Sequence, residues 1–294
     1  MKKLAFLILF ILVGFLLLIV FFDKSASDND KLTIVTTFYP PAEFASQIGK
    51  DKINVVNITS GGIEPHDFEP SPKDLVNIEN ADLFILNGQD FDHWAEELVD
   101  ENEGINALNL SDYIKSDLPD NDPHFWLDPL YARELVGVIS SKLIYIDQEN
   151  REFYEINTSN YQGELIQLDE DYRSGLGNCS QRKIVVSHDA FSYVANRYSF
   201  EIINISGLSP EEEPTSKTLI DISNSVKENN IKYIFYETLV SPDLANTIAN
   251  ETSASTLVLN PLEGLTNQEV SEGENYVSIM RSNLDNLRIA MECQ

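Results

Sequence analysis

Positive charge is scarce in this sequence. Lysine and arginine together number 20 against 48 aspartates and glutamates, which gives a formal net charge of −28. Such a surface repels nucleic acids and anionic lipid headgroups, so we expect no nucleic-acid partner. The acidic residues are scattered along the chain, a distribution typical of a solubilising surface that attracts cations only weakly.

Long hydrophobic runs are absent except at the N-terminus. Residues 4–22 form 19 uninterrupted apolar residues after Lys2 and Lys3, enough for a helix to span a bilayer. The two lysines would stay cytoplasmic, so the rest of the chain is expected outside the cytoplasm. The run is long for a signal-peptide core, and no cysteine follows it to carry a lipid. We predict an uncleaved anchor on the outer face of the cytoplasmic membrane. A cleaved signal, giving a periplasmic or secreted protein, is the alternative.

Cysteine is equally rare, with only Cys179 and Cys293 in the chain. Their separation excludes the C-x-x-C spacing of metal and redox sites. In an exported protein an even number of cysteines indicates a disulfide, which here would tie the last helix to the second half of the chain. Two unrelated thiols are the alternative.

Catalytic metal motifs such as H-E-x-x-H are missing as well. Ser187, His188 and Asp189 are consecutive, and consecutive residues at a strand end cannot form a serine triad. We therefore expect that the protein is not an enzyme.

Short β-rich runs alternate with helical patterns along the rest of the chain. Their nearly continuous apolar character fits parallel strands that helices cover on both faces. The predicted fold class is α/β, with two lobes whose parallel sheets are flanked by helices. Strands are predicted at 31–38, 53–59, 82–88, 183–191, 200–207, 231–239 and 255–262, and helices at 41–49, 71–81, 218–230 and 242–252.

Residues 147–177 contain no proline and predict one long helix that ends near the glycines at 175 and 177. Its expected apolar stripe includes Phe153, Ile156, Leu165 and Leu168. About 25 helical residues reach nearly 40 Å, enough to run along both lobes and to limit their swing. The predicted domains are an anchor and tether at 1–30, a first lobe at 31–146, the connecting helix at 147–178 and a second lobe at 179–294.

Three of the four histidines lie on loops that follow or adjoin β-rich runs. His66 lies in GGIEPHDFEPSPKDL, His124 in DNDPHFWLDPL and His188 in IVVSHDAF, while Glu263 follows the last predicted strand in LVLNPLEGLT. In open α/β sheets, ligands bind beyond the carboxyl ends of the strands. The pattern therefore indicates a metal site in the interlobe cleft, with two ligands from each lobe.

Four motifs resemble the zinc/manganese receptor family, the metal-binding extracytoplasmic solute-binding proteins of ABC importers. They are GIEPHDFEPSPKDL, DPHFWLDP, VVSHDAFSYVANRY and NPLEGLT, and their order and separations also fit. The resemblance covers roughly residues 31–294. It implies two α/β lobes joined by one long helix, with the metal held between the lobes, and it matches the three family histidines with His66, His124 and His188.

The fourth family ligand is usually a carboxylate on the last loop. Asn260 stands where many members have aspartate, whereas Glu263 stands where some zinc-binding members have their ligand. We therefore predict Glu263 as the fourth ligand, with Glu237 or a water as the alternatives. Members that bind manganese commonly have a carboxylate where His188 stands. Three imidazoles and one carboxylate thus favour Zn²⁺ over Mn²⁺, although copper and nickel also accept imidazole.

Residues beside the histidines have expected supporting roles. A metal-bound histidine usually donates its second ring N–H to a carboxylate or carbonyl, and Asp67, Asp122 and Asp189 are near in sequence. Turn formation or helix capping is the alternative role of these aspartates, and it is slightly favoured for Asp189, because a helix is predicted to begin there. His93 lies outside every family motif and is expected at the surface.

The resemblance implies a receptor that captures Zn²⁺ and delivers it to an importer. Because the chain has no phosphate-binding loop and only one predicted span, it needs a separate ABC permease and ATPase. We expect a monomer whose metal affinity falls below about pH 6, since histidine must be neutral to ligate. Some members carry a histidine-rich acidic loop, but here the loop at 110–124 has only its carboxylates for weak capture of metal. A zinc hydrolase with Glu263 as general base and a surface adhesin are the alternatives.

Overall fold

The computed structural model describes residues 31–115 and 122–294. The predicted anchor and tether, and the centre of the acidic loop at 110–124, lie outside the described residues. Within the described ranges, none of the helices combines the length and apolarity that a membrane crossing requires.

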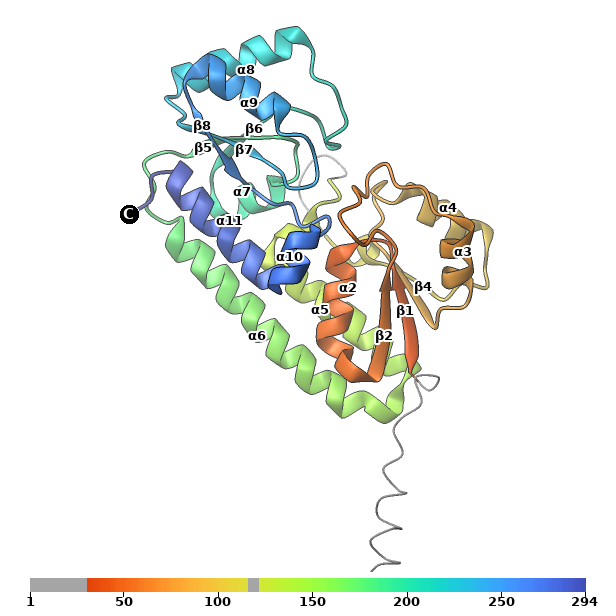
Figure 1. Ribbon diagram of the computed structural model, residues 1–294. Coiled ribbons are helices and arrows are strands. Elements are labelled where there is room, and N and C mark those ends of the chain that lie inside the picture. The colour runs from red at the N-terminus through yellow and green to blue at the C-terminus, as the bar shows by residue number, and fades with distance from the viewer. Residues whose placement is uncertain (1–30, 116–121) are drawn as a thin grey trace, which may run out of the picture. The chain divides into compact units, whose positions relative to one another are not determined.

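The first lobe is built on a four-stranded sheet in the order β2-β1-β3-β4 (Figure 1). β1 (Leu32–Thr36), β2 (Ile53–Asn57) and β3 (Leu83–Leu86) confirm the three predicted strands. β3 pairs in parallel with β1 and with β4 (Ala107–Asn109). All four residues of β3 are buried, as expected for a strand covered on both faces. β4 was not predicted, because it has three residues and buries only Leu108.

The second lobe repeats this arrangement with a sheet in the order β6-β5-β7-β8. Its members are β5 (Lys183–Val186), β6 (Glu201–Asn204), β7 (Tyr233–Tyr236) and β8 (Ser255–Val258), and every pair is parallel. All four predicted strands are confirmed. The predicted runs extend past the strands because apolar residues continue into the loops at the carboxyl ends.

The first-lobe helices are α2 (Tyr39–Gly49), α3 (Pro72–Glu79), α4 (His93–Glu101) and α5 (Pro129–Ile146). Ser71 caps α3 in a capping box with Asp74, and a proline occupies the first helical position. α5 also has a capped N-terminus, since the Asp128 carboxylate accepts from the backbone N–H groups of Leu130 and Tyr131.

The second-lobe helices are α7 (Ser192–Tyr198), α8 (Ser216–Glu228), α9 (Asp243–Thr252), α10 (Asn267–Glu272) and α11 (Tyr276–Ala290). α8 and α9 confirm two predicted helices and lie together on one side of the sheet (Figure 1). Ile222 of α8 and Ile248 of α9 pack in one core cluster with Val185 and Ile234 of the sheet.

The predicted long helix is α6 (Arg151–Gly175), which has 25 residues. It packs against α2 and α5 of the first lobe and α11 of the second (Figure 1). The N-terminal part of its predicted apolar stripe was wrong, because Ile156 is 54% exposed and Tyr154 is buried instead. The Tyr154 hydroxyl donates to Asp147 at 2.6 Å, so the ring is buried without leaving its polar end unpaired.

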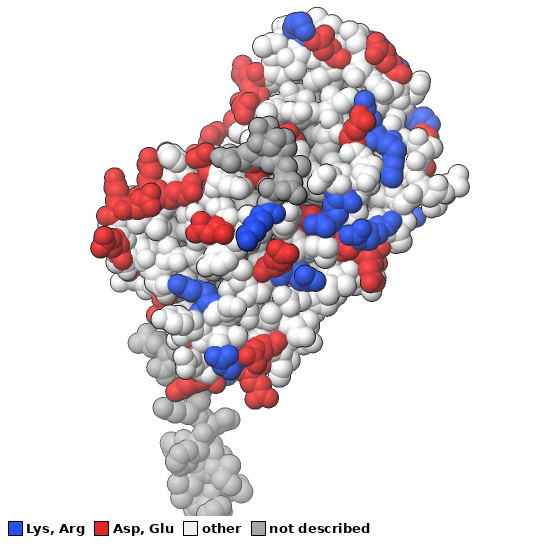
Figure 2. Space-filling view, turned by 180° about the vertical axis from the view of Figure 1, so that it is seen from behind, with Lys and Arg blue, Asp and Glu red and all other residues white. Residues whose placement is uncertain are grey.

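Cys179 and Cys293 form the predicted disulfide. The bridge joins the segment before β5 to the end of the chain after α11. The surface of the lobes carries both signs of charge. On the described part of the face shown in Figure 2, acidic side chains crowd the left edge and lysines and arginines lie closer to the centre and right.

Candidate metal centre

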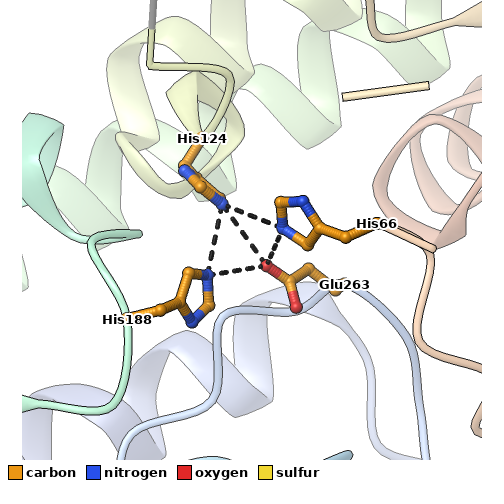
Figure 3. Close-up of side chains that lie close together, drawn as sticks. All are labelled: His66, His124, His188 and Glu263. Carbon is orange, nitrogen blue, oxygen red and sulfur yellow. Dashed lines mark hydrogen bonds and ion pairs between the residues drawn. The ribbon is translucent and has the colours of Figure 1, made fainter. Parts of the chain in front are cut away.

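The structure brings His66, His124, His188 and Glu263 together (Figure 3). Each offers one ligand atom, and these atoms all lie within 4.8 Å of one another. His66 follows β2, His188 follows β5 and Glu263 follows β8, whereas His124 immediately precedes the 3-10 turn η4 (Phe125–Leu127). The site thus lies beyond the carboxyl ends of parallel strands, with two side chains from each lobe, as the sequence pattern predicted.

The candidate ligand atoms are the Nε2 atoms of the three histidines and Oε1 of Glu263. Oε1 lies 3.3 Å from Nε2 of His66, 3.4 Å from that of His124 and 3.2 Å from that of His188. His124 Nε2 lies 3.4 Å from His66 Nε2 and 3.3 Å from His188 Nε2. Four ligand atoms therefore converge on one small space from four separate loops.

The cluster is withdrawn from water. The side chains of His124 and His188 are 0% exposed, that of Glu263 is 1% exposed and that of His66 is 9% exposed. Burial of ionisable groups is costly unless they pair with one another or with a metal. Three buried imidazoles around one carboxylate are therefore a functional arrangement and not solvated loop residues.

Two of the histidines have a carboxylate behind them. Nδ1 of His124 lies 2.7 Å from Asp122 Oδ1, and Nδ1 of His188 lies 2.7 Å from Glu237 Oε1. Because an ionised carboxylate only accepts hydrogen bonds, each Nδ1 carries a proton, and Nε2 is the atom that can present a lone pair to the centre once the imidazole is neutral. Asp122 therefore has the supporting geometry that was expected. Glu237, the alternative ligand, lies behind His188 and not beside the other ligand atoms.

The remaining sequence-predicted residues have other surroundings. The Asp189 carboxylate accepts from the Ser192 hydroxyl at 2.6 Å beside the start of α7, but no described side chain accepts from the backbone N–H groups of that helix, so the capping expected of Asp189 was wrong. Asp67 is exposed and makes no hydrogen bond to a histidine among the described residues. His93 is 65% exposed and pairs with Glu97 at 3.1 Å, which confirms a surface position. It forms an exposed group with Asp90 and Glu96 at the N-terminus of α4, where the helix dipole disfavours a cation.

Asn260 shapes the loop that carries Glu263. Its Oδ1 accepts from Leu262 N at 2.7 Å, and Leu262 has a left-handed φ of 60°. Its Nδ2 donates to Glu269 at 2.8 Å, so the side chain is fully engaged away from the imidazoles. This local bonding explains how a carboxylate three residues further along can reach the centre.

The imidazoles and carboxylates of the cluster shift one another's pKa values in opposite directions. Burial alone would lower the pKa of His188, but the carboxylates of Glu237 and Glu263 raise it well above the usual value. Burial alone would raise the pKa of Glu263, but His188 and hydrogen bonds from the other imidazoles lower it well below the usual value. The site without metal is thus a buried carboxylate held among proton-bearing imidazoles.

Glu64 is a site residue that sequence reasoning missed. Its Oε1 accepts from the backbone N–H of His66 at 2.9 Å. Burial and the nearby charge of Glu263 raise the pKa of Glu64 to about 9. The only sequence signal was its position two residues before a candidate ligand, on the same proline-containing loop.

Comparison with known families and proteins agrees with this geometry. The family model described as "Zinc-uptake complex component A periplasmic" matches residues 34–290. The high-affinity zinc uptake system protein ZnuA of Bacillus subtilis is 37% identical over 281 residues, which cover 89% of this chain and 88% of that protein. The zinc-binding lipoprotein AdcA of Streptococcus pneumoniae is 35% identical over 98% of this chain, but the match spans only 61% of AdcA.

Solved structures of related proteins have a similar fold. The Zn(II)-bound ZnuA-like domain of Streptococcus pneumoniae AdcA has a TM-score of 0.80 at 38% identity, covering 89% of this chain and 99% of that one. The laminin-binding protein Lmb of Streptococcus agalactiae, described as having adhesin and metal-transporting activity, has a TM-score of 0.80 at 33% identity, covering 88% and 99%. The match runs through both lobes and all four convergent loops, and the chain belongs to the family of zinc-uptake complex component A proteins.

Proposed function

We propose that this chain is an extracytoplasmic receptor that captures Zn²⁺ and delivers it to an ABC-type importer. His66, His124, His188 and Glu263 are the proposed ligands. The observation that carries the proposal is the convergence of their four candidate ligand atoms, with five of the six separations at 3.2–3.4 Å.

These separations fit a tetrahedral zinc ion. In a regular tetrahedron the distance between two ligand atoms is about 1.63 times the metal–ligand distance. Zn–N distances of about 2.0–2.1 Å therefore require ligand atoms about 3.3–3.4 Å apart. Five of the six separations, at 3.2–3.4 Å, match this requirement.

The donor set favours zinc over manganese. Three imidazole nitrogens and one carboxylate oxygen suit zinc, whereas manganese prefers sites with more oxygen donors. The hydrogen bonds from Nδ1 to Asp122 and Glu237 raise the basicity of two of the imidazoles and fix their ring orientation. The relatives described as zinc-uptake and zinc-binding proteins support the same choice.

Delivery requires partners. In this proposal the chain is a monomer held at the outer face of the cytoplasmic membrane through residues 4–22. It passes zinc to a permease driven by a separate ATPase. The division at 31–146, 147–178 and 179–294 is part of the proposal. Since α6 packs against helices of both lobes, release by a small adjustment of the lobes is favoured over a wide hinge.

The two alternatives fit less well. A hydrolase would use Glu263 as a general base beside an open metal position, but its Oε1 lies among the ligand atoms, 3.2 Å from His188 Nε2. An adhesin role would be additional to transport, because Lmb is described as having both activities. Binding of laminin by zinc-free chain would support adhesion as a separate function.

Metal analysis of the purified full-length chain tests the proposal. We expect one zinc per chain, retained in the presence of excess manganese, and a His124→Ala variant that is folded but loses the zinc. His93→Ala is the matched control, because it removes an exposed histidine outside the site and should keep full zinc content. Absence of zinc from the wild type, or equal retention by His124→Ala, would overturn the proposal.

A further inference from the structure

The first-lobe segment at 122–128, which carries His124, is bonded to the second lobe at both ends. The Tyr193 hydroxyl of α7 donates to the backbone carbonyl of Asp122 at 2.8 Å. Arg197, one turn further along α7, pairs through Nε with the Asp128 carboxylate. Tyr193 is 3% exposed and the Asp128 side chain 2%, whereas the Arg197 side chain is 22% exposed, so the first contact is shielded from water and the second partly shielded.

Aromatic contacts support the same interface. The ring of Tyr193 meets the ring of Tyr131 edge-on, with centroids 5.5 Å apart. The Arg197 guanidinium lies 5.5 Å from the centroid of the Tyr131 ring. Tyr131 belongs to the first turn of α5, directly after Asp128. The side of α7 that carries Tyr193 and Arg197 is therefore packed and hydrogen-bonded against the first lobe.

These contacts connect two proposed ligands from opposite lobes. α7 begins at Ser192, shortly after His188, so its position is tied to that of His188. Asp122, which receives the Tyr193 hydrogen bond, in turn accepts from the backbone N–H and Nδ1 of His124 at 2.9 and 2.7 Å. His188 and His124 are therefore connected without a metal. The chain links His188 to α7, and hydrogen bonds link Tyr193 of α7 to Asp122 and Asp122 to His124.

We propose that Tyr193 and Arg197 are positioning residues that clasp the two lobes and hold His124 at the correct distance from His188 before zinc arrives. This inference rests on the proposed zinc-binding function. A metal site needs its ligands within about 0.5 Å of the productive geometry, and holding them there beforehand removes an ordering cost from binding. The clasp performs this task at the seam, where His124 Nε2 and His188 Nε2 already lie 3.3 Å apart.

A tyrosine on the same helix provides the matched control. Tyr198 is also buried, and its hydroxyl donates to a carboxylate, Asp169 of α6, at 3.0 Å. This contact does not involve the segment at 122–128. Tyr193→Phe and Tyr198→Phe each delete one buried hydroxyl from α7, but only the first breaks the connection between the two histidines.

Zinc affinity of the full chain, measured by competition with a chelator, gives the first test. We expect Tyr193→Phe to bind zinc roughly fivefold more weakly, the factor that loss of one ordinary hydrogen bond produces. Tyr198→Phe should stay within twofold of the wild type. The visible spectrum of bound Co²⁺ should change for Tyr193→Phe alone, because it reports ligand geometry and not stability. Arg197→Lys, which keeps the charge, should weaken binding in the same direction as Tyr193→Phe.

Hydrogen exchange of the metal-free chain gives a test that does not need zinc. Amides at 122–128 should exchange faster in Tyr193→Phe and at the wild-type rate in Tyr198→Phe. The proposed clasp would be wrong if amide exchange and zinc affinity were unchanged in Tyr193→Phe, or if both variants changed equally. If the wild type bound no zinc, the proposed receptor function would fail, whereas the exchange result would still decide whether the clasp exists.

Discussion

The first lobe supplies two of the proposed ligands from segments that are held in very different ways. His124 lies in the segment at 122–128, which four bonds join to the second lobe. In addition to the contacts of Tyr193 and Arg197, Trp126 Nε1 donates to the Pro261 carbonyl at 2.9 Å and the Tyr276 hydroxyl donates to the Trp126 carbonyl. Pro261 is two residues from Glu263, so His124 is tied to both ligand loops of the second lobe.

His66 lies in a loop with far fewer restraints. Gly61 and Gly62 both have left-handed φ values, 83° and 82°, a conformation that glycine adopts without strain. The bond from His66 N–H to Glu64 lies within the loop itself. Among the described residues, no carboxylate accepts from His66 Nδ1, in contrast with His124 and His188.

The difference indicates that the proposed ligand set combines a part that is fixed by bonds to the second lobe with a part that has fewer restraints. His66 is also the most exposed of the four, at 9%. In the proposed receptor, the preorganised residues would lower the ordering cost of capture, and the loop of His66 would adapt to the arriving ion.

Removal of one imidazole from each segment tests this comparison with the largest expected effect. His124→Ala should weaken zinc binding by more than about 100-fold, because loss of a ligand should exceed the 10–100-fold cost of losing a supporting partner. His66→Ala should cost roughly tenfold less, since water can occupy the more open position of a zinc site. Competition with a chelator measures both. Equal losses, or a larger loss for His66→Ala, would show that the two segments do not differ in this way.

The groups behind the histidines provide a second, smaller contrast. Glu237→Gln should weaken zinc binding by about 10-fold or more, because it removes the charge that supports the His188 imidazole. Glu64→Gln should change the affinity by less than about threefold, since it keeps an acceptor for the His66 N–H and replaces a carboxyl whose pKa is already raised to about 9. If Glu64→Gln were the more damaging variant, the loop of His66 would be the part that fixes the geometry. Unchanged binding by Glu237→Gln would remove the case for its supporting role.

Much of this architecture could be predicted because strands and ligand loops leave local signals. The sheets are short apolar runs, and three of the four proposed ligands lie on loops that follow such runs. The role of Glu237 could not be predicted, because it depends on the order of the strands. β7 lies next to β5 in the sheet, so Glu237 after β7 stands beside His188 after β5. Amino-acid patterns predict strands but not which strands are neighbours.

Contacts between the two lobes could not be predicted from the sequence for the same reason. The Tyr193 hydroxyl and its acceptor, Asp122, are 71 residues apart and lie in different lobes. Their sequences show only a tyrosine on a helix and an aspartate in a loop. The error in the predicted apolar stripe of α6 has another cause. Hydrophobicity favoured Ile156, which is exposed, over Tyr154, whose ring is buried while its hydroxyl donates to Asp147.

Titration of the buried ligands gives the third prediction. Because the carboxylates of Glu237 and Glu263 raise the pKa of His188 despite its burial, protons should compete with zinc already above pH 6.5, and not only below about pH 6. Zinc affinity should therefore keep rising between pH 6.5 and 8, with protons released on binding. Calorimetry in two buffers of different ionisation enthalpy measures this release. A flat affinity across this range would contradict the raised pKa.

The same groups set the stability of the metal-free chain. The raised pKa of His188 contributes stability that is fully present below its ordinary value of 6.5 and is lost as the pH rises through the folded-state value. The lowered pKa of Glu263 contributes stability that is present above 4.5 and is lost as the pH falls through the folded-state value. Denaturant unfolding of metal-free chain should thus show higher stability near pH 5.5 than near pH 8, and His188→Ala should reduce this difference.

The smallest effect on the site is expected from the disulfide. Cys179→Ser with Cys293→Ser opens a link between residues 114 positions apart and should lower the free energy of unfolding by about 2–4 kcal/mol. Zinc affinity should stay within twofold, because the bridge lies at the ends of the second lobe and not at the ligand loops. The link to the clasped segment is indirect, through α11, whose Tyr276 donates to the Trp126 carbonyl. A tenfold loss of zinc affinity in the double variant would mean that the position of the His124 segment depends on the anchoring of α11. If a second covalent link to α11 then restored the affinity, loss of that anchoring would be the cause.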